Sequence, residues 1–183
     1  MRGRHTLAAI CGALCLLLAG CGGSPEPKPP PKAEPSTSPS PSATPPVMPA
    51  AAKEKTKAGA EAFVRHYVAL LNHAQATGEV DPMRAVESPS CKSCRSVQDD
   101  LTKLYGSGGH IEGGAWTLSQ VIGVDPTPNG GRNVALVVTF GPQEVVRPEP
   151  APAQHLKGGS LPLTMQLSTD PAGWRVAEWT RGR

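Results

Sequence analysis

Aromatic side chains are scarce in this sequence. Phe, Tyr and Trp make up 4% of the 183 residues, so a folded core must be built mainly from Leu, Val and Ala. An excess of charge is missing as well: from Ala58 to Arg183 there are 11 Lys and Arg against 12 Asp and Glu, a net charge of −1. Proteins that bind nucleic acid through its phosphates carry a clear positive excess. We therefore expect no nucleic-acid partner.

The sequence also lacks the motifs of common active sites. It contains no glycine-rich phosphate loop, no recognisable Ser-His-Asp set and no run of metal ligands. The histidines do not complete a zinc site with the available cysteines, because His66, His73, His110 and His155 follow no ligand spacing. These patterns predict no catalytic residue, no metal and no cofactor, and they favour a protein that is not an enzyme.

The N-terminal segment is typical of a secretory signal peptide. Arg2 and Arg4 precede an apolar run from Leu7 to Leu18, which is too short for the roughly 20 residues of a membrane-spanning helix. The run ends in Leu18-Ala19-Gly20-Cys21, and this tetrapeptide resembles the lipobox of bacterial lipoproteins. The resemblance implies cleavage before Cys21, a diacylglycerol on its sulfur, and an extracytoplasmic protein anchored to the cell membrane by lipid. The alternative is a plain signal peptide in which Cys21 has no role.

A proline-rich stretch follows. Residues 22–52 hold 11 of the chain's 21 prolines and few large apolar side chains, so they cannot bury enough surface to offset their ordering entropy. The composition predicts a signal peptide over residues 1–20, the lipidated cysteine and a Pro/Ser-rich disordered tether over 21–57, and one domain over 58–183. A ligand for a Pro-binding partner is the alternative interpretation of the tether.

The periodicity of the domain changes from helix to strand. Phe63, Tyr67, Leu70 and Leu71 recur at helical spacing and predict a helix over 55–77 that ends at Gly78. Asp81-Pro82 predicts an N-cap and a short helical turn, and a second long helix should end at Gly106. Apolar residues then alternate in four stretches, which are 115–124, 132–140, 160–168 and 174–180. Residues 148–159 are rich in Pro and Gly and predict a long loop. This order predicts an α+β domain with N-terminal helices on one curved antiparallel sheet of about four strands.

Two resemblances accompany this pattern. The long first helix, Asp81-Pro82 and the terminal DPAGWRVAEW resemble the nuclear-transport-factor-2-like (cystatin-like) superfamily, which implies a cone-shaped fold. The chain is also similar to bacterial lipoproteins with a C-terminal domain of unknown function, in which a lipobox, a Pro/Ser-rich tether, SxxCxxC and GWxVxxW occur together. That family implies no activity.

Once the leader is removed and Cys21 carries the lipid, Cys91 and Cys94 are the remaining cysteines. Outside the cytoplasm thiols tend to form disulfides, and residues i and i+3 of a first helical turn lie about 5 Å apart, within reach of one bond. We expect a structural disulfide. A redox-active dithiol is the main alternative, because Lys92, Arg95 and a helix N-terminus would lower a thiol pKa. A metal site is disfavoured because two further ligands are needed.

Two polar residues interrupt strands that otherwise alternate apolar. Gln120 and Glu178 would decorate the mouth of a cone-shaped pocket if they face inward, whereas Glu178 would otherwise pair with Arg175 or face solvent. We expect a non-catalytic domain that binds an unidentified cell-envelope protein or ligand. The alternatives are a small-molecule-binding or enzymatic cone-fold domain and a CxxC thiol oxidoreductase.

Overall fold

The long helix that the sequence predicts forms one layer of the fold. The structure, a computed structural model, describes residues 44–182. Helix α1 spans Lys57–Thr77, and Thr56 caps its first turn by accepting a hydrogen bond from the Gly59 N–H at 3.0 Å. Gly78 ends α1 in the left-handed conformation, with φ 80°, which glycine adopts without a side-chain penalty. The predicted helix and its stop are confirmed.

Two shorter helices follow α1. Helix α2 spans Asp81–Arg84 and α3 spans Lys92–Gly106. The N-cap of α2 is Val80 and not Asp81, and the Asp81 carboxylate pairs within the turn with the Arg84 guanidinium at 2.5 Å. No helix within residues 44–182 is long and apolar enough to cross a membrane.

The folded part begins earlier than the sequence predicts. Residues Ala50–Lys53 form the short helix η1, and Ala52 in it is buried. The Trp174 indole N–H donates to the Glu54 carbonyl oxygen at 2.8 Å. A segment predicted as tether is therefore packed structure, because it supplies an acceptor for a buried indole. The predicted signal peptide, Cys21 and the tether before residue 44 lie outside the described residues.

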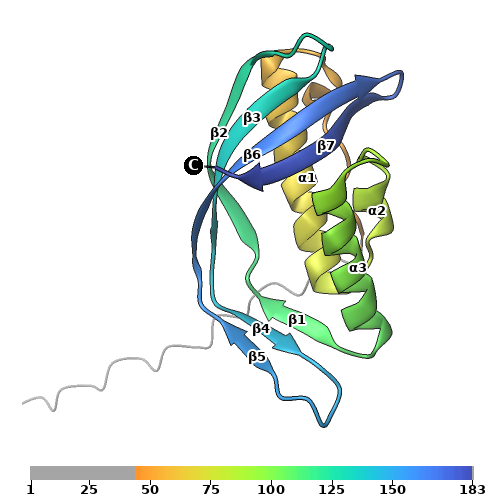
Figure 1. Ribbon diagram of the computed structural model, residues 1–183, viewed down its shortest axis with the longest axis vertical. Helices are drawn as coiled ribbons and strands as arrows, with labels where there is room; N and C mark the ends of the chain where they lie inside the picture. The colour runs from red at the N-terminus through yellow and green to blue at the C-terminus, as the bar shows by residue number, and fades with distance from the viewer. Residues whose placement is uncertain (1–43, 183) are drawn as a thin grey trace, which may run out of the picture. The chain divides into compact units, whose positions relative to one another are not determined.

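The described strands form two antiparallel sheets rather than the single curved sheet that the sequence predicts. The larger sheet has the order β2-β3-β6-β7 and contains the four predicted stretches. Its strands are β2 (Trp116–Pro126), β3 (Arg132–Phe140), β6 (Gly159–Asp170) and β7 (Gly173–Arg181). Helix α1 packs against β2 and β3, and Figure 1 shows it lying along this sheet with α3 beside β7.

The smaller sheet was not predicted. It has the order β1-β4-β5, formed by β1 (His110–Gly113), β4 (Gln143–Val146) and β5 (Gln154–Leu156). Strand β5 lies inside the predicted loop 148–159. These strands are short and carry no buried apolar alternation, so the period-2 signal that reveals a strand is absent. The α+β class itself is confirmed.

The core lies between α1 and the larger sheet. Every second residue of β3 and β6 faces it, including Val134, Leu136, Leu163 and Met165, all at most 2% exposed. Phe63 of α1 is fully buried there. Leu and Val therefore supply most of this core, as the shortage of aromatic residues requires.

Candidate functional site

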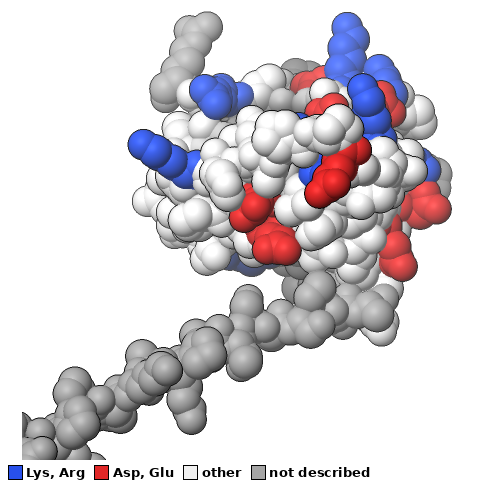
Figure 2. All heavy atoms as spheres, turned by 90° about the horizontal axis from the view of Figure 1, so that it is seen from below, with Lys and Arg blue, Asp and Glu red and all other residues white. Residues whose placement is uncertain are grey.

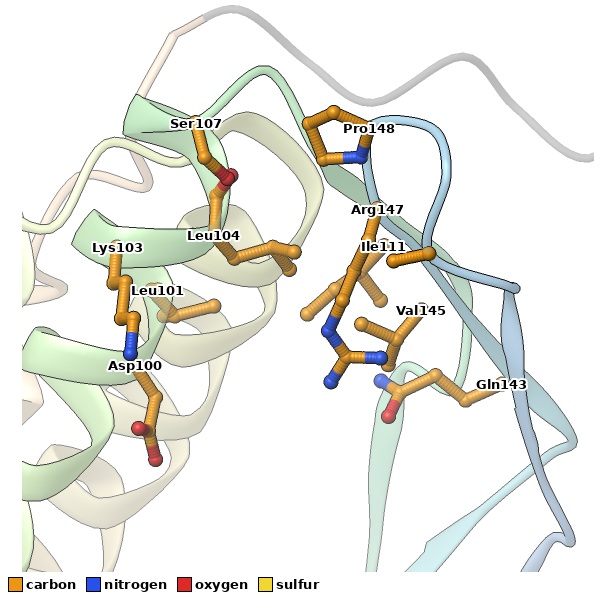
Figure 3. A pocket seen from close by; sticks show the side chains of 11 residues that line it. Asp100, Leu101, Lys103, Leu104, Ser107, Ile111, Gln143, Val145, Arg147 and Pro148 are labelled. Atoms are coloured by element: carbon orange, nitrogen blue, oxygen red, sulfur yellow. The ribbon is translucent and has the colours of Figure 1, made fainter.

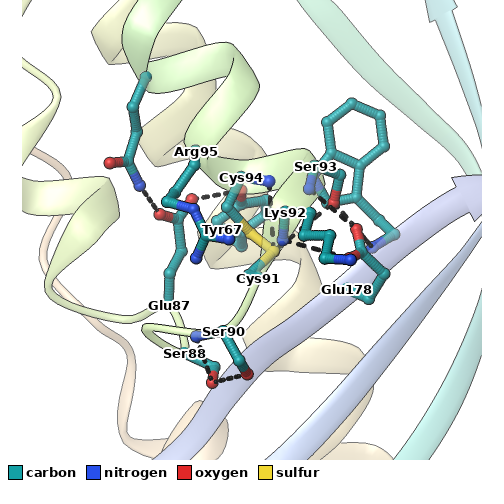
Figure 4. The surroundings of a disulfide bond; sticks show 12 residues. Tyr67, Glu87, Ser88, Ser90, Cys91, Lys92, Ser93, Cys94, Arg95 and Glu178 are labelled. Atoms are coloured by element: carbon teal, nitrogen blue, oxygen red, sulfur yellow. Dashed lines mark hydrogen bonds between the residues drawn. A yellow bond between two sulfur atoms is a disulfide. The ribbon is translucent and has the colours of Figure 1, made fainter.

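The Cys91–Cys94 pair lies where the larger sheet meets the start of α3. The structure joins the two sulfurs in a disulfide with a Cα–Cα distance of 5.3 Å (Figure 4). Cys91 is the N-cap of α3, and its Sγ accepts a hydrogen bond from the Cys94 N–H at 3.2 Å. The residues are 0% and 1% exposed. The bond is thus part of the packed interior.

Burial decides what this disulfide can do chemically. Thiol–disulfide exchange requires a thiolate to reach one of the two sulfurs, and neither sulfur-bearing residue is open to solvent. The bond instead spans the first turn of α3, and the turn before it is closed by a hydrogen bond from the Cys91 N–H to the Ser88 carbonyl oxygen at 2.9 Å. This arrangement suits a structural disulfide better than a redox-active one.

Glu178 of β7 contacts the first turn of α3. Its carboxylate accepts hydrogen bonds from the backbone N–H groups of Lys92 at 3.2 Å and Ser93 at 3.0 Å, at the positive end of the α3 dipole. The Ser93 hydroxyl and these N–H groups hold the pKa of Glu178 below its ordinary value. Gln120 is exposed on β2. The hypothesis that these two residues flank one pocket stays a prediction, and the hydrogen bonds of Glu178 direct its carboxylate towards α3.

A buried carboxylate that the sequence did not reveal lies beside the disulfide. Glu87 is 6% exposed, and it accepts hydrogen bonds from the Tyr67 hydroxyl at 2.6 Å and from the Gln98 amide. Arg84 Nε donates in turn to Gln98 Oε1 at 3.0 Å. Burial raises the pKa of Glu87. Glu87 stands in a loop without periodicity, so no local signal predicts its burial.

A cleft lies between the C-terminal half of α3 and the smaller sheet (Figure 3). Its volume is about 700 Å³, within the usual range for small-ligand sites. Ile111 of β1 pairs with Val145 of β4, so both side chains emerge on the same sheet face. The apolar lining consists of Leu101, Leu104, Ile111, Val145, Pro148 and Ala151.

The polar lining of the cleft contains two cations and one acid. Lys103 and Asp100 come from α3, and Arg147 follows β4. Gln143 adds an amide from the start of β4. Sequence reasoning missed this site because β4 carries no periodic signal and Arg147 precedes a segment predicted as loop. Neither Gln120 nor Glu178 lines it.

No metal centre is formed by the described residues. Within 44–182, no three His, Cys, Asp or Glu side chains are grouped so that they could hold a metal ion. His73 is buried and its Nε2 lies 3.1 Å from Glu79, while burial lowers the pKa of His66. These histidines therefore belong to the packing of α1 rather than to a ligand set.

Comparison with solved structures gives several distant likenesses. The intermembrane-space region of the chloroplast protein ARC6 shares 13% identity, with a TM-score of 0.48 over 69% of this chain and 95% of that chain. A protein from Catenulispora acidiphila shares 12% identity, with a TM-score of 0.47 over 68% and 91% of the respective chains. An uncharacterised protein with a cystatin-like fold from Caulobacter vibrioides shares 10% identity, with a TM-score of 0.42 over 66% and 87%.

Sequence comparison points to one family. The search of curated proteins returned no match. The family model DUF6318, described as a family of unknown function, matches residues 25–161, which include α1, α3, the disulfide and both cleft-lining strands. Because the match extends over most of the chain, the protein belongs to the DUF6318 family of unknown function.

Proposed function

We propose that this protein is a lipid-anchored extracytoplasmic domain that binds a component of the cell envelope without catalysing its conversion. The anchor is Cys21, and the tether between Cys21 and the folded part gives the domain reach above the membrane. The leader with its Leu18-Ala19-Gly20-Cys21 sequence supports this location. The Cys91–Cys94 disulfide supports it as well, because such bonds persist in oxidising compartments.

The observation that carries the binding role is the cleft between α3 and the smaller sheet. It combines an apolar floor with a few polar groups at its sides, which is the usual make-up of a ligand site. Its walls come from separate elements, so its shape depends on the tertiary fold rather than on one loop.

Binding is favoured over catalysis because the carboxylates near α3 are already engaged in structural hydrogen bonds. Glu178 is engaged by the N-terminus of α3, and Glu87 is engaged by Tyr67 and Gln98. Carboxylates held in this way serve as structural acceptors, whereas a general acid or base must reach a substrate proton. Redox chemistry is disfavoured by the burial of Cys91 and Cys94.

The anchor is tested by labelling intact cells with radioactive palmitate. The chain should incorporate label and fractionate with membranes, and Cys21→Ala should abolish both. Cys91→Ala is the matched control, since it removes a cysteine outside the lipobox and should keep the label. Label that persists in Cys21→Ala would refute the anchor.

The binding role is tested by photo-crosslinking in the same cells. A photoreactive amino acid replaces either Leu104, which lines the cleft, or Ile122, which is exposed on β2. We expect a discrete adduct from position 104 and none from position 122. Equal adducts from both positions, or none from position 104, would contradict binding through the cleft.

A further inference from the structure

The cleft contains hydrogen-bond donors that lack acidic partners. The Arg147 guanidinium donates to the Gln154 side-chain oxygen at 3.2 Å, and within residues 44–182 it makes no ion pair. In the same part of the chain, the side chains of Lys103 and Gln143 have no hydrogen-bond partner. A cation at an apolar surface without a counter-charge favours an anion from outside the protein.

Strand register aims these donors at one region. Gln143, Val145 and Arg147 are separated by two residues each, so they share a side of β4 and its continuation. Figure 3 shows the Arg147 guanidinium and the Gln143 amide directed into the space between the sheet and α3. The donors therefore stand beside the apolar floor and not on the outer surface of the sheet.

The floor itself suits a hydrocarbon. Leu101 and Leu104 are three residues apart on α3, which puts them on one helix face. Ile111 and Val145 form the opposite wall. Leu104, Ile111 and Val145 are only partly buried, so apolar surface remains exposed to water inside the cleft, and covering it releases free energy.

We infer that the cleft binds a single-chain amphiphile with an anionic headgroup, placing a carboxylate or phosphate against Arg147 and Gln143 and its hydrocarbon chain along Leu104, Ile111 and Val145. The inference rests on the proposed function, because it names the ligand class for the same cleft. The planar guanidinium matches either oxyanion in a bidentate manner. Lys103, on the opposite wall, adds a second positive charge.

The charge distribution also argues against a polyanionic ligand. Asp100 is the acidic side chain in the cleft lining, and it stands on the α3 wall, away from β4. Figure 2 views the end of the molecule where β4 and β5 lie, and there acidic and basic side chains are scattered among uncharged ones. A polyanion would need a continuous basic surface, whereas one headgroup needs only the local donors.

The three isoleucines of the chain provide a site-specific test. Ile111 lines the cleft, Ile122 is exposed on β2, and Ile10 lies in the apolar leader. The full chain is labelled at isoleucine methyl groups and titrated, below micelle-forming concentration, with octanoate, octyl phosphate or octanol while methyl NMR shifts are followed. Ile10 reports adsorption to the leader, and Ile122 reports non-specific effects.

Octanoate or octyl phosphate should shift the Ile111 methyl saturably and leave Ile122 unmoved, and the tighter of the two identifies the headgroup. Octanol should bind more weakly than either anion, by about tenfold or by a larger factor, because it cannot use the charge on Arg147. Arg147→Gln should weaken anion binding about tenfold. The exposed Arg65→Gln on α1 removes the same charge elsewhere and should change nothing.

Two results would overturn the inference. One is an Ile111 methyl that does not shift with either anion, and the other is octanol binding that matches anion binding and is equally insensitive to Arg147→Gln. If crosslinking from position 104 persists in either case, the cleft still binds a partner and only the ligand class is wrong. If crosslinking fails too, the binding role itself is refuted.

Discussion

The Tyr67 hydroxyl donates a 2.6 Å hydrogen bond to Glu87 although both residues are almost completely buried. Tyr67 belongs to α1, and Glu87 lies in the loop that leads to the disulfide. An ionised carboxylate in such a place loses its hydration, so burial raises the pKa of Glu87 above its ordinary value of 4.5. The same burial raises the pKa of Tyr67 well above 10. The hydrogen bond therefore connects the loop to the core, while burial of Glu87 disfavours its ionised form.

We predict that Glu87 makes the protein less stable as pH rises. Between pH 4.5, where the unfolded chain ionises, and the higher pKa of the folded state, the folded protein holds more protons than the unfolded one. Its free energy of unfolding therefore falls with increasing pH across that window. Glu87→Gln cannot ionise, so it should lack this fall. Urea denaturation of both proteins at a series of pH values measures the difference.

The exposed Glu149→Gln is the control for this comparison, because Glu149 makes no contact with the Tyr67–Glu87 pair. It should follow the pH dependence of the wild type. If the difference in unfolding free energy between wild type and Glu87→Gln is the same at every pH, the pKa of Glu87 is not raised by burial in the folded protein.

Glu178 should have the opposite pH dependence. Its folded-state pKa is lowered, so its contribution is present above the ordinary value of 4.5 and is lost as pH falls through the folded pKa. Glu178→Gln should cost about 0.5 kcal/mol at pH 7, a small value because the side chain is only partly buried and water screens its charge. The cost should disappear in acid and decrease in high salt. A cost independent of pH would show that packing, not charge at the α3 N-terminus, is responsible.

The disulfide should stabilise the domain modestly. Replacing Cys91 and Cys94 by Ser should lower the free energy of unfolding by about 2 kcal/mol, because the bond closes a very short loop. The matched double Ala variant should lose roughly 1 kcal/mol more, since Ser at position 91 can still cap α3 and Ala cannot. Chemical denaturation compares the variants. Equal stability of the Ser and Ala variants would contradict the capping role of Cys91.

Solvent exclusion of the disulfide has its own test. Dithiothreitol should reduce the bond slowly in the native protein and rapidly in urea, because Cys91 and Cys94 are buried. Mass spectrometry after alkylation follows the reaction. Rapid reduction without denaturant would revive the redox interpretation.

Gly78 should be far less tolerant of substitution than Gly106. A Cβ at Gly78 would lie 2.5 Å from the Tyr105 ring, and its φ is 80°, so Gly78→Ala should cost about 2 kcal/mol or more. Gly106 has open space around it, and Gly106→Ala should be neutral or slightly stabilising. Thermal melts of the two variants test the contrast. Similar melting temperatures would indicate that α1 does not end against Tyr105.

The sequence predicts the elements whose residues repeat. Helical spacing from Phe63 to Leu71 and alternation along β3 and β6 identify buried faces, because a helix and a strand expose the same side at fixed intervals. A spacing of three residues is enough to bring Cys91 and Cys94 within bonding distance at a helix start. Periodicity cannot reveal β1, β4 and β5, because these strands are short and have no repeating apolar face.

The sequence alone therefore determined the α+β class, the main helices, the larger sheet's strands and the proximity of the two cysteines. The tertiary structure decided that Glu178 caps a helix 85 residues earlier in the chain, that Glu87 is buried, and that Arg147 joins Leu104 in one cleft. The physical reason is the separation along the sequence over which each kind of signal acts. Periodicity depends on neighbours within a few residues, whereas these contacts arise when strand pairing and helix packing bring distant segments together.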